Sequence, residues 1–171
     1  MIDGNSSPPT SLGIEPSYRG ISHYNNSNMV LATSALNELR SHLSFAQLRF
    51  HCRKQLGRTF HVSTLANNAG EAVVKYFSRQ TDAMPSACGS FARLPGDNSV
   101  LARNCSNWGK DGGYHIGKWG HKGWHELYEY AAFIAFDYHW APNPAFEDDR
   151  MECDDRGTVV SPGDFWKIYV R

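Results

Sequence analysis

Two segments in the middle of the chain alternate between apolar and polar residues, and this pattern constrains the fold most strongly. Residues 48–52 have the sequence LRFHC and residues 59–64 have the sequence TFHVST. A period of two residues is typical of a strand with one buried face and one solvated face. The residues between them, 53–58, are basic and contain a glycine, so we expect an antiparallel hairpin. Phe60 and Val62 should face the core.

Other short segments also favour strands. Residues 72–77 are rich in β-forming side chains and follow a turn sequence at 67–70, and residues 131–140 form the most apolar run of the chain. Residues 165–170 alternate again, and 29–39 fit either a short strand or a helix that Asn28 caps. With about seven strands and no internal repeat, the sequence predicts an all-β fold, an antiparallel β-sandwich of jelly-roll type with long loops and room for one short helix.

The length of 171 residues fits one domain. Residues 1–11 are polar and contain adjacent prolines, so we expect a flexible amino-terminal arm followed by a single domain over residues 12–171. Lys plus Arg and Asp plus Glu both number 17, so the formal charge is zero and a nucleic-acid partner is not expected. No apolar run approaches the roughly 18 residues that span a bilayer.

The cysteines favour an oxidising compartment. Their number is even, and they show neither a CxxC pair nor a zinc-type spacing with histidine, so we expect two disulfides. Four reduced, buried thiols are the alternative. Four cysteines allow three connectivities, among which the sequence does not choose, although two of them lie close together in the chain. The candidate disulfide residues are Cys52, Cys88, Cys105 and Cys153.

Three N-x-S/T triplets are candidate glycosylation sites, and they begin at Asn5, Asn25 and Asn104. They agree with an extracellular or secreted location. Residues 1–10 lack the basic start and apolar centre of a signal peptide, so we expect the chain to be a module or fragment of a larger protein.

A series of motifs runs from Phe45 to Arg171: LRFHC, GRTFHV, GEAVVKYFS, QTDAMPSACGSF, GKWG and SPGDFWKIYVR. This series resembles an extracellular module of uncharacterised cnidarian secreted and surface proteins. The resemblance implies an extracellular setting and a repeatable module, but it implies no activity, ligand or catalytic residue.

A shorter stretch, Ser11–Glu15 with Ile21 and residues 32–34, is similar to the opening of discoidin-type domains (coagulation factor 5/8 C-terminal type), which are adhesive β-sandwiches. This chain lacks the framing cysteines of that family, so no residues are carried over from it.

The stretch Trp108–Trp140 contains four of the five tryptophans and four of the eight histidines. Its first half is interrupted by glycines, and we interpret it as an aromatic loop. Because Trp and Tyr rings stack on the CH faces of sugars, this loop predicts a carbohydrate site. The alternative is that the rings fill the core. The candidate ligand-binding residues are Asn107, Trp108, Tyr114, Trp119 and Trp124.

The segment 147–155 is acidic and supplies the hard oxygen ligands that Ca²⁺ prefers, with Asp164 farther along the chain. It lacks the spacing of an EF-hand, and a solvated run of charge is the alternative. Calcium is therefore the candidate cofactor, and its candidate ligands are Glu147, Asp148, Asp149, Glu152, Asp154 and Asp155.

Zinc is a weaker candidate. His121 and His125 lie four residues apart, with His115 or His139 as a third ligand, but Gly120 and Gly123 disfavour the helix that would align the pair.

The chain contains no GxSxG, Walker or dinucleotide-binding motif, so it is not expected to be an enzyme. We expect a recognition or adhesion module whose partner is a carbohydrate or an extracellular protein. The alternatives are a calcium-dependent, lectin-like carbohydrate-binding domain and a structural spacer within a larger extracellular protein.

Overall fold

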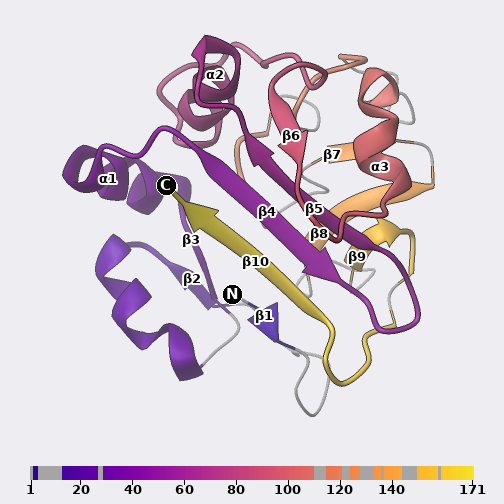
Figure 1. The fold of residues 1–171 in the computed structure, drawn as a ribbon. Coiled ribbons are helices and arrows are strands. Elements are labelled where there is room, and N and C mark those ends of the chain that lie inside the picture. The colour runs from indigo at the N-terminus through magenta and orange to yellow at the C-terminus, as the bar shows by residue number, and fades with distance from the viewer. Residues whose placement is uncertain are drawn as a thin grey trace.

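The main sheet has five strands, and every pair of neighbours in it is antiparallel (Figure 1). The computed structural model describes residues 2–3, 13–26, 29–109, 115–120, 124–127, 133–135, 137–143, 150–157 and 159–171. In spatial order the strands are β1 (Ile2–Asp3), β10 (Phe165–Val170), β4 (Leu48–Arg53), β5 (Thr59–Thr64) and β6 (Phe91–Arg93).

Two smaller sheets and several helices accompany the main sheet. A three-stranded antiparallel sheet lies behind it in Figure 1 and contains β7 (Phe133–Ala135), β8 (Tyr138–Asn143) and β9 (Arg150–Asp155). A parallel pair consists of β2 (Gly13–Glu15) and β3 (Met29–Leu31). The helices are α1 (Thr33–Leu43), α2 (Asn68–Phe77), α3 (Val100–Arg103) and the 3₁₀ segments η1 (Tyr18–Asn26) and η2 (Cys105–Asn107). No helix in the described ranges is both long and apolar enough to cross a bilayer.

The fold is therefore mixed α/β, with about 31% strand and 26% helix among the described residues. The predicted antiparallel sheets are present, but the predicted all-β class is wrong. The predicted boundary between an arm at 1–11 and a domain at 12–171 remains a prediction. Ile2–Asp3 pair with β10, and residues 4–12 lie outside the described part.

Residues 67–77, predicted as a turn and a strand, form α2 and its cap. The side chain of Asn67 accepts hydrogen bonds from the backbone N–H groups of Ala69 and Gly70, both at 3.1 Å, and this starts the helix. Gly70 packs so closely that a Cβ there would lie 1.9 Å from the carbonyl oxygen of Leu65. The β-forming residues are tolerated because helical spacing buries Val73, Val74, Tyr76 and Phe77.

Two other segments also differ from the sequence prediction. The apolar run 131–140 is not one strand: Phe133–Ala135 and Tyr138–Asn143 pair as a hairpin, β7–β8. The two alternatives for residues 29–39 are both partly right, because Met29–Leu31 is a strand and Thr33–Leu43 is a helix.

The predicted central hairpin is confirmed. β4 pairs with β5, and Phe50 lies opposite Val62. Phe60 and Val62 are fully buried, as their alternation predicts. β10 adds to the other edge of β4 and contributes Trp166 to the same face.

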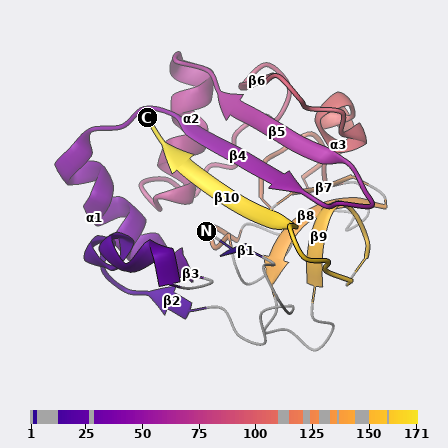
Figure 2. The ribbon, with the colours of Figure 1, turned by 60° about the horizontal axis from the view of Figure 1, so that its bottom comes forward.

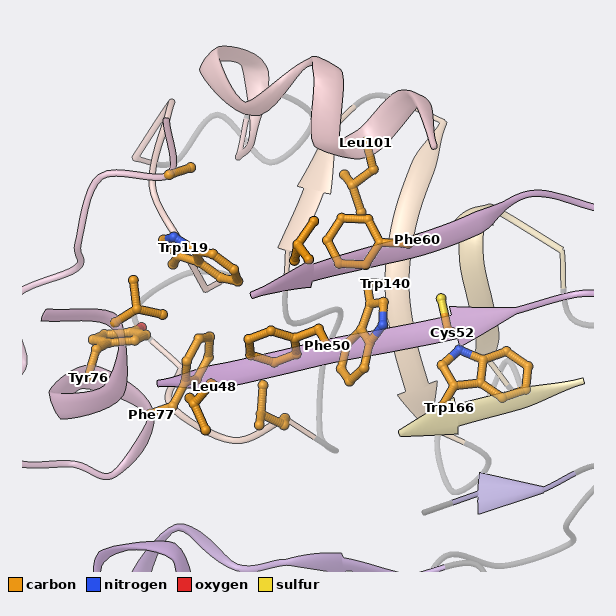
Figure 3. Close-up of a cluster of buried hydrophobic side chains, with 14 of the residues drawn as sticks. Leu48, Phe50, Cys52, Phe60, Tyr76, Phe77, Leu101, Trp119, Trp140 and Trp166 are labelled. Carbon is orange, nitrogen blue, oxygen red and sulfur yellow. The ribbon is translucent and has the colours of Figure 1, made fainter. Parts of the chain in front are cut away.

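The core lies between the inner face of the main sheet and the layer formed by α2, α3 and the three-stranded sheet (Figure 2). Phe50 is at its centre, with ring contacts to Phe77, Trp119 and Trp140 at centroid distances of 5.9, 5.3 and 5.5 Å (Figure 3). These aromatic contacts join the main sheet to both α2 and the small sheet.

Both predicted disulfides are present. Cys52–Cys153 joins β4 to β9, with both cysteines fully buried, and Cys88–Cys105 closes a short loop in front of η2. Within the described structure no cysteine is free. The two bonds are consistent with an extracellular protein.

Removal of the two disulfides should have unequal effects. The Cys52–Cys153 bond spans 101 residues and the Cys88–Cys105 bond spans 17. The loop-entropy model gives about 4.7 kcal/mol for a loop of the first size and about 3 kcal/mol for the second. We expect Cys52→Ala/Cys153→Ala to lower the free energy of unfolding more than Cys88→Ala/Cys105→Ala, as measured by denaturant titration. An equal or reversed loss would show that the long cross-link does not dominate.

Candidate functional site

Two rings of the predicted aromatic loop belong to the core. Trp108 and Trp119 are 0% exposed and meet edge to face at 4.8 Å. Their indole N–H groups donate to the carbonyl of Leu101 at 2.8 Å and to the hydroxyl of Ser90 at 2.7 Å. Neither ring presents a face to a sugar, so the alternative interpretation as core residues describes both.

The other three candidates of that loop do not form an aromatic site among the described residues. Asn107 is half-buried at the end of η2, and Tyr114 lies outside the described residues. Trp124 is 39% exposed, and its backbone carbonyl accepts the hydroxyl hydrogen of Tyr76 at 2.8 Å. Trp124 is the one described tryptophan of the set with an exposed side chain.

The acidic segment is a strand where it is described, because Arg150–Asp155 is β9. Glu152 is buried and bonds the Nδ1 atom of His139 at 2.9 Å, and Asp155 pairs with Lys54 at 2.8 Å. Each of these carboxylates therefore has a protein partner in a different part of the fold. The described residues contain no group of three or more potential metal ligands. Glu147, Asp148 and Asp149 lie outside the described residues.

Asp154 is a buried residue that stabilises the fold, and it is not exposed as a metal ligand would be. The β8–β9 register shifts beside it, and its φ is +58°, so it leaves the regular ladder. Its carboxylate is fully buried, pairs with Arg58, and accepts the backbone N–H groups of Val100 at 2.9 Å and Leu101 at 2.6 Å. A bulge in β9 thus anchors the start of α3.

The remaining predicted residues are not gathered into a site. His125 is buried and bonds the carbonyl of Tyr76 and the carboxylate of Asp82, whereas His115 is exposed and His121 lies outside the described residues. Asp164 is also buried, and it accepts the backbone N–H groups of Gln55 and Ser161.

Among the candidate glycosylation sites, Asn104 is half-buried at the end of α3. Asn25 lies in η1 with its side chain undescribed, and Asn5 is outside the described residues.

The outer face of the main sheet is the strongest candidate for a functional site. It is the face toward the viewer in Figure 1, and none of the described helices or strands lies across it. The register places Arg49 opposite Tyr169, His51 opposite Lys167, and Arg53 opposite Phe165. On the other side of β4, His51 lies opposite His61. We call this set the outer-face layer: Arg49, His51, Arg53, His61, Phe165, Lys167 and Tyr169.

Stacking contacts order the outer-face layer. The rings of His51 and His61 stack at 3.9 Å, and Phe165 meets His51 edge to face at 4.8 Å. The Arg49 guanidinium lies 4.7 Å from the centroid of the Tyr169 ring, and the Lys167 ammonium lies 4.7 Å from that of Phe165. Cation–π contacts therefore position two of the three cations.

The hydrogen bonds of His61 fix its protonation. Arg49 donates its Nε hydrogen to Nε2 of His61 at 2.8 Å, so that nitrogen is an acceptor. The proton is then on Nδ1, which donates to the carbonyl oxygen of Pro95 at 2.9 Å. His61 is a neutral support for Arg49, with both ring nitrogens occupied.

The cations of the outer-face layer have no carboxylate partner within the described residues. Most buried or half-buried cations elsewhere do have one: Arg40 pairs with Glu71, Lys54 with Asp155, and Arg58 with Asp154. Arg49, Arg53 and Lys167 instead contact rings, His61 or solvent. Among the described side chains, the positive charge of the outer-face layer is thus not paired with a carboxylate, although the whole chain is neutral.

A pocket of about 420 Å³ opens beside the outer-face layer. It is lined by His51, His61 and Phe165, by the turn at 95–98, and by Arg53 at the end of β4. His51 makes no hydrogen bond through either ring nitrogen to any described residue. The pocket therefore combines a mostly polar lining with the apolar ring of Phe165 and with a donor and an acceptor of His51.

The environment of the outer face changes the pKa of His51. Burial is the largest cause that lowers the pKa of His51 from 6.5 to about 4, followed by electrostatic interaction with His61 and with the cations Arg49, Lys167 and Arg53. The ring is therefore neutral at pH 7 and keeps one N–H donor and one acceptor.

Sequence reasoning missed this site because it used the net charge of the whole chain. The alternation within β4 does place Arg49 and His51 on the solvated face. The alternation within β10 likewise places Lys167 and Tyr169 on the face away from the apolar residues of that strand. Only the pairing of β10 with β4 brings these side chains together, across 118 positions from Arg49 to Lys167.

No protein-family model, curated protein or solved structure matches this chain.

Replacement of His51 should remove a pH-dependent part of the stability. Its pKa in the folded chain, about 4, lies below the unfolded value of 6.5, so the unfolded chain binds more protons between these values. Stability should fall as the pH drops from 6.5 toward 4, by about 2 kcal/mol after allowance for partial exposure. Urea unfolding at pH 7 and pH 4.5 should show a smaller loss in His51→Gln than in the parent. His42→Gln, which removes an exposed histidine of α1, is the control and should keep the parental loss.

Asp154→Asn should destabilise the fold whether calcium is present or not. It removes a buried charge on which Arg58 and the start of α3 depend, which costs about 3 kcal/mol. Asp137→Asn, which affects only an exposed pair with Arg156, should cost less than about 1 kcal/mol. Thermal unfolding in calcium and in EDTA checks this. A loss that appears only with calcium would identify Asp154 as a metal ligand.

Proposed function

We propose that this chain is a recognition module of an extracellular protein and that it binds its ligand on the outer face of the main sheet. The observation that carries the proposal is the outer-face layer itself, whose cations Arg49, Arg53 and Lys167 have no carboxylate partner among the described residues. The adjoining pocket adds a ring nitrogen and an N–H group of His51.

The rigidity of the layer supports binding. Six of its seven side chains, all except that of Arg53, make ring stacking or cation–π contacts with one another, and most of these are half-buried or buried. Side chains that are already ordered lose less conformational entropy when a ligand arrives. A strand-based scaffold cross-linked by Cys52–Cys153 keeps them in place.

Binding without turnover is part of this proposal. Both nitrogens of His61 are engaged, and His51, with a pKa of about 4, is a weak base at neutral pH. The layer is therefore suited to hold a ligand rather than to move its protons.

Two alternatives make different predictions. A structural spacer has no need for uncompensated cations beside a pocket. A calcium-dependent lectin needs free carboxylates, whereas Glu152, Asp154 and Asp155 are engaged with His139, Arg58 and Lys54. A recognition surface that works without calcium agrees better with these contacts.

The test is a binding screen with paired variants. The purified domain is applied to an array of neutral glycans, anionic glycans and extracellular matrix proteins, in calcium and in EDTA. We expect at least one ligand, retained in EDTA and lost in Phe165→Ser/Tyr169→Ser. Leu43→Ser/Val159→Ser is the control, because these exposed apolar residues lie outside the outer-face layer.

Binding that survives the outer-face substitutions would refute the proposed surface. The absence of any ligand from a folded domain would favour the spacer. Thermal unfolding of all variants establishes that the fold is retained.

A further inference from the structure

We infer that the ligand of the outer face is an anionic glycan whose sulfate or carboxylate groups pair with Arg49, Arg53 and Lys167, while one sugar unit occupies the pocket beside His51. This inference rests on the proposed function and specifies the chemical class of its ligand.

The arrangement of the cations matches a linear polyanion. Arg49 and Arg53 lie four residues apart on the same face of β4, which separates them by about 13 Å. Lys167 lies between these two levels, because its partner in β10–β4 pairing is His51. Three positive groups thus follow the strand direction over more than the length of one sugar ring.

The cations are held in a way that leaves their hydrogens available. Arg49 donates its Nε hydrogen to His61, and its guanidinium lies over the ring of Tyr169. Both terminal nitrogens of the guanidinium therefore remain available for an anion. Lys167 contacts the Phe165 ring and makes no hydrogen bond to any described residue. Charge-assisted hydrogen bonds from such groups to sulfate or carboxylate are stronger than neutral ones.

The pocket fits the uncharged part of the same ligand. Its volume of about 420 Å³ is in the range of small-ligand sites. His51 supplies one donor and one acceptor, and Asn98, whose Oδ1 already accepts from Thr59, offers its amide hydrogens. Sugar hydroxyls, which both donate and accept, are the groups that such a mixture binds.

A glycan fits better than a nucleic acid, the other common polyanion. Two disulfides are consistent with an oxidising compartment, where anionic polymers are chiefly glycans. The chain also has no net positive charge, so it lacks the long-range field with which nucleic-acid-binding proteins collect phosphates. Single-stranded DNA is therefore included in the test as the competing class.

The experiment measures binding to four probes in EDTA: heparin as the sulfated glycan, chemically desulfated heparin, neutral dextran and single-stranded DNA. We expect heparin to bind best and to be weakened by salt, because the contacts are ion pairs near the surface. Arg53→Gln/Lys167→Gln should weaken heparin binding about tenfold, which corresponds to about threefold for each exposed ion pair.

The control variant removes two positive charges elsewhere. Arg79→Gln/Lys118→Gln changes the net charge equally but affects an exposed arginine after α2 and a lysine that bonds Ser86, neither in the outer-face layer. Heparin binding by this variant should stay within about twofold of the parent. Circular dichroism and thermal unfolding should show that both double variants are folded.

The outcomes separate the inference from the proposed function. An equal loss in both double variants would overturn the inference, because it would reduce the binding to net charge. Equal or tighter binding of DNA would overturn the assigned class. Preference for dextran or desulfated heparin, lost in Phe165→Ser/Tyr169→Ser, would overturn the anionic ligand and leave the proposed surface intact. No binding to any probe would overturn the inference, and a failed array screen would then overturn the proposed function as well.

Discussion

The disulfide between Cys52 and Cys153 is the constraint on which the rest of the structure depends. It joins the central strand of the main sheet to the edge strand of the small sheet, and both sulfur atoms are buried in the core. The indole N–H of Trp166 donates to the carbonyl of Glu152 at 2.9 Å beside it, and Figure 3 shows that indole next to Cys52. The cross-link fixes the distance between the two sheets, and the aromatic rings fill the space that results.

The same junction explains the buried charges of β9. A strand that crosses under the main sheet brings its carboxylates into the protein, where each needs a partner. Asp154 finds Arg58 and the start of α3, and Glu152 finds His139. The acidic residues of this strand are thus used to orient the hairpin turn, α3 and β8, rather than being free to bind a metal.

The position of the core also explains why the outer face is polar and is the proposed ligand-binding surface. The inner face of the main sheet takes the apolar residues of β4, β5 and β10, and all of the described helices and the small sheet cover that side or its edges (Figure 2). The alternate residues must then face outward, where none of the cations of β4 and β10 pairs with a described carboxylate. Positive side chains remain in register on two adjacent strands, and burial together with their charge lowers the pKa of His51.

The sequence by itself determined what depends on neighbouring residues. Alternation at 48–52, 59–64 and 165–170 located three strands of the main sheet and identified Phe60 and Val62 as core residues, and an even cysteine count predicted two disulfides. These features follow from local periodicity and composition, which any reader of the chain can see. Only the tertiary structure decided what depends on distant partners. The β-forming residues at 72–77 became helical because Asn67 caps them and the sheet buries their apolar side, and Trp108 and Trp119 became core residues because the main sheet offers an apolar surface. The outer-face layer exists because β10 returns to β4 after more than one hundred residues, and a pairing over that distance is set by packing and by the Cys52–Cys153 bond, which no local pattern contains.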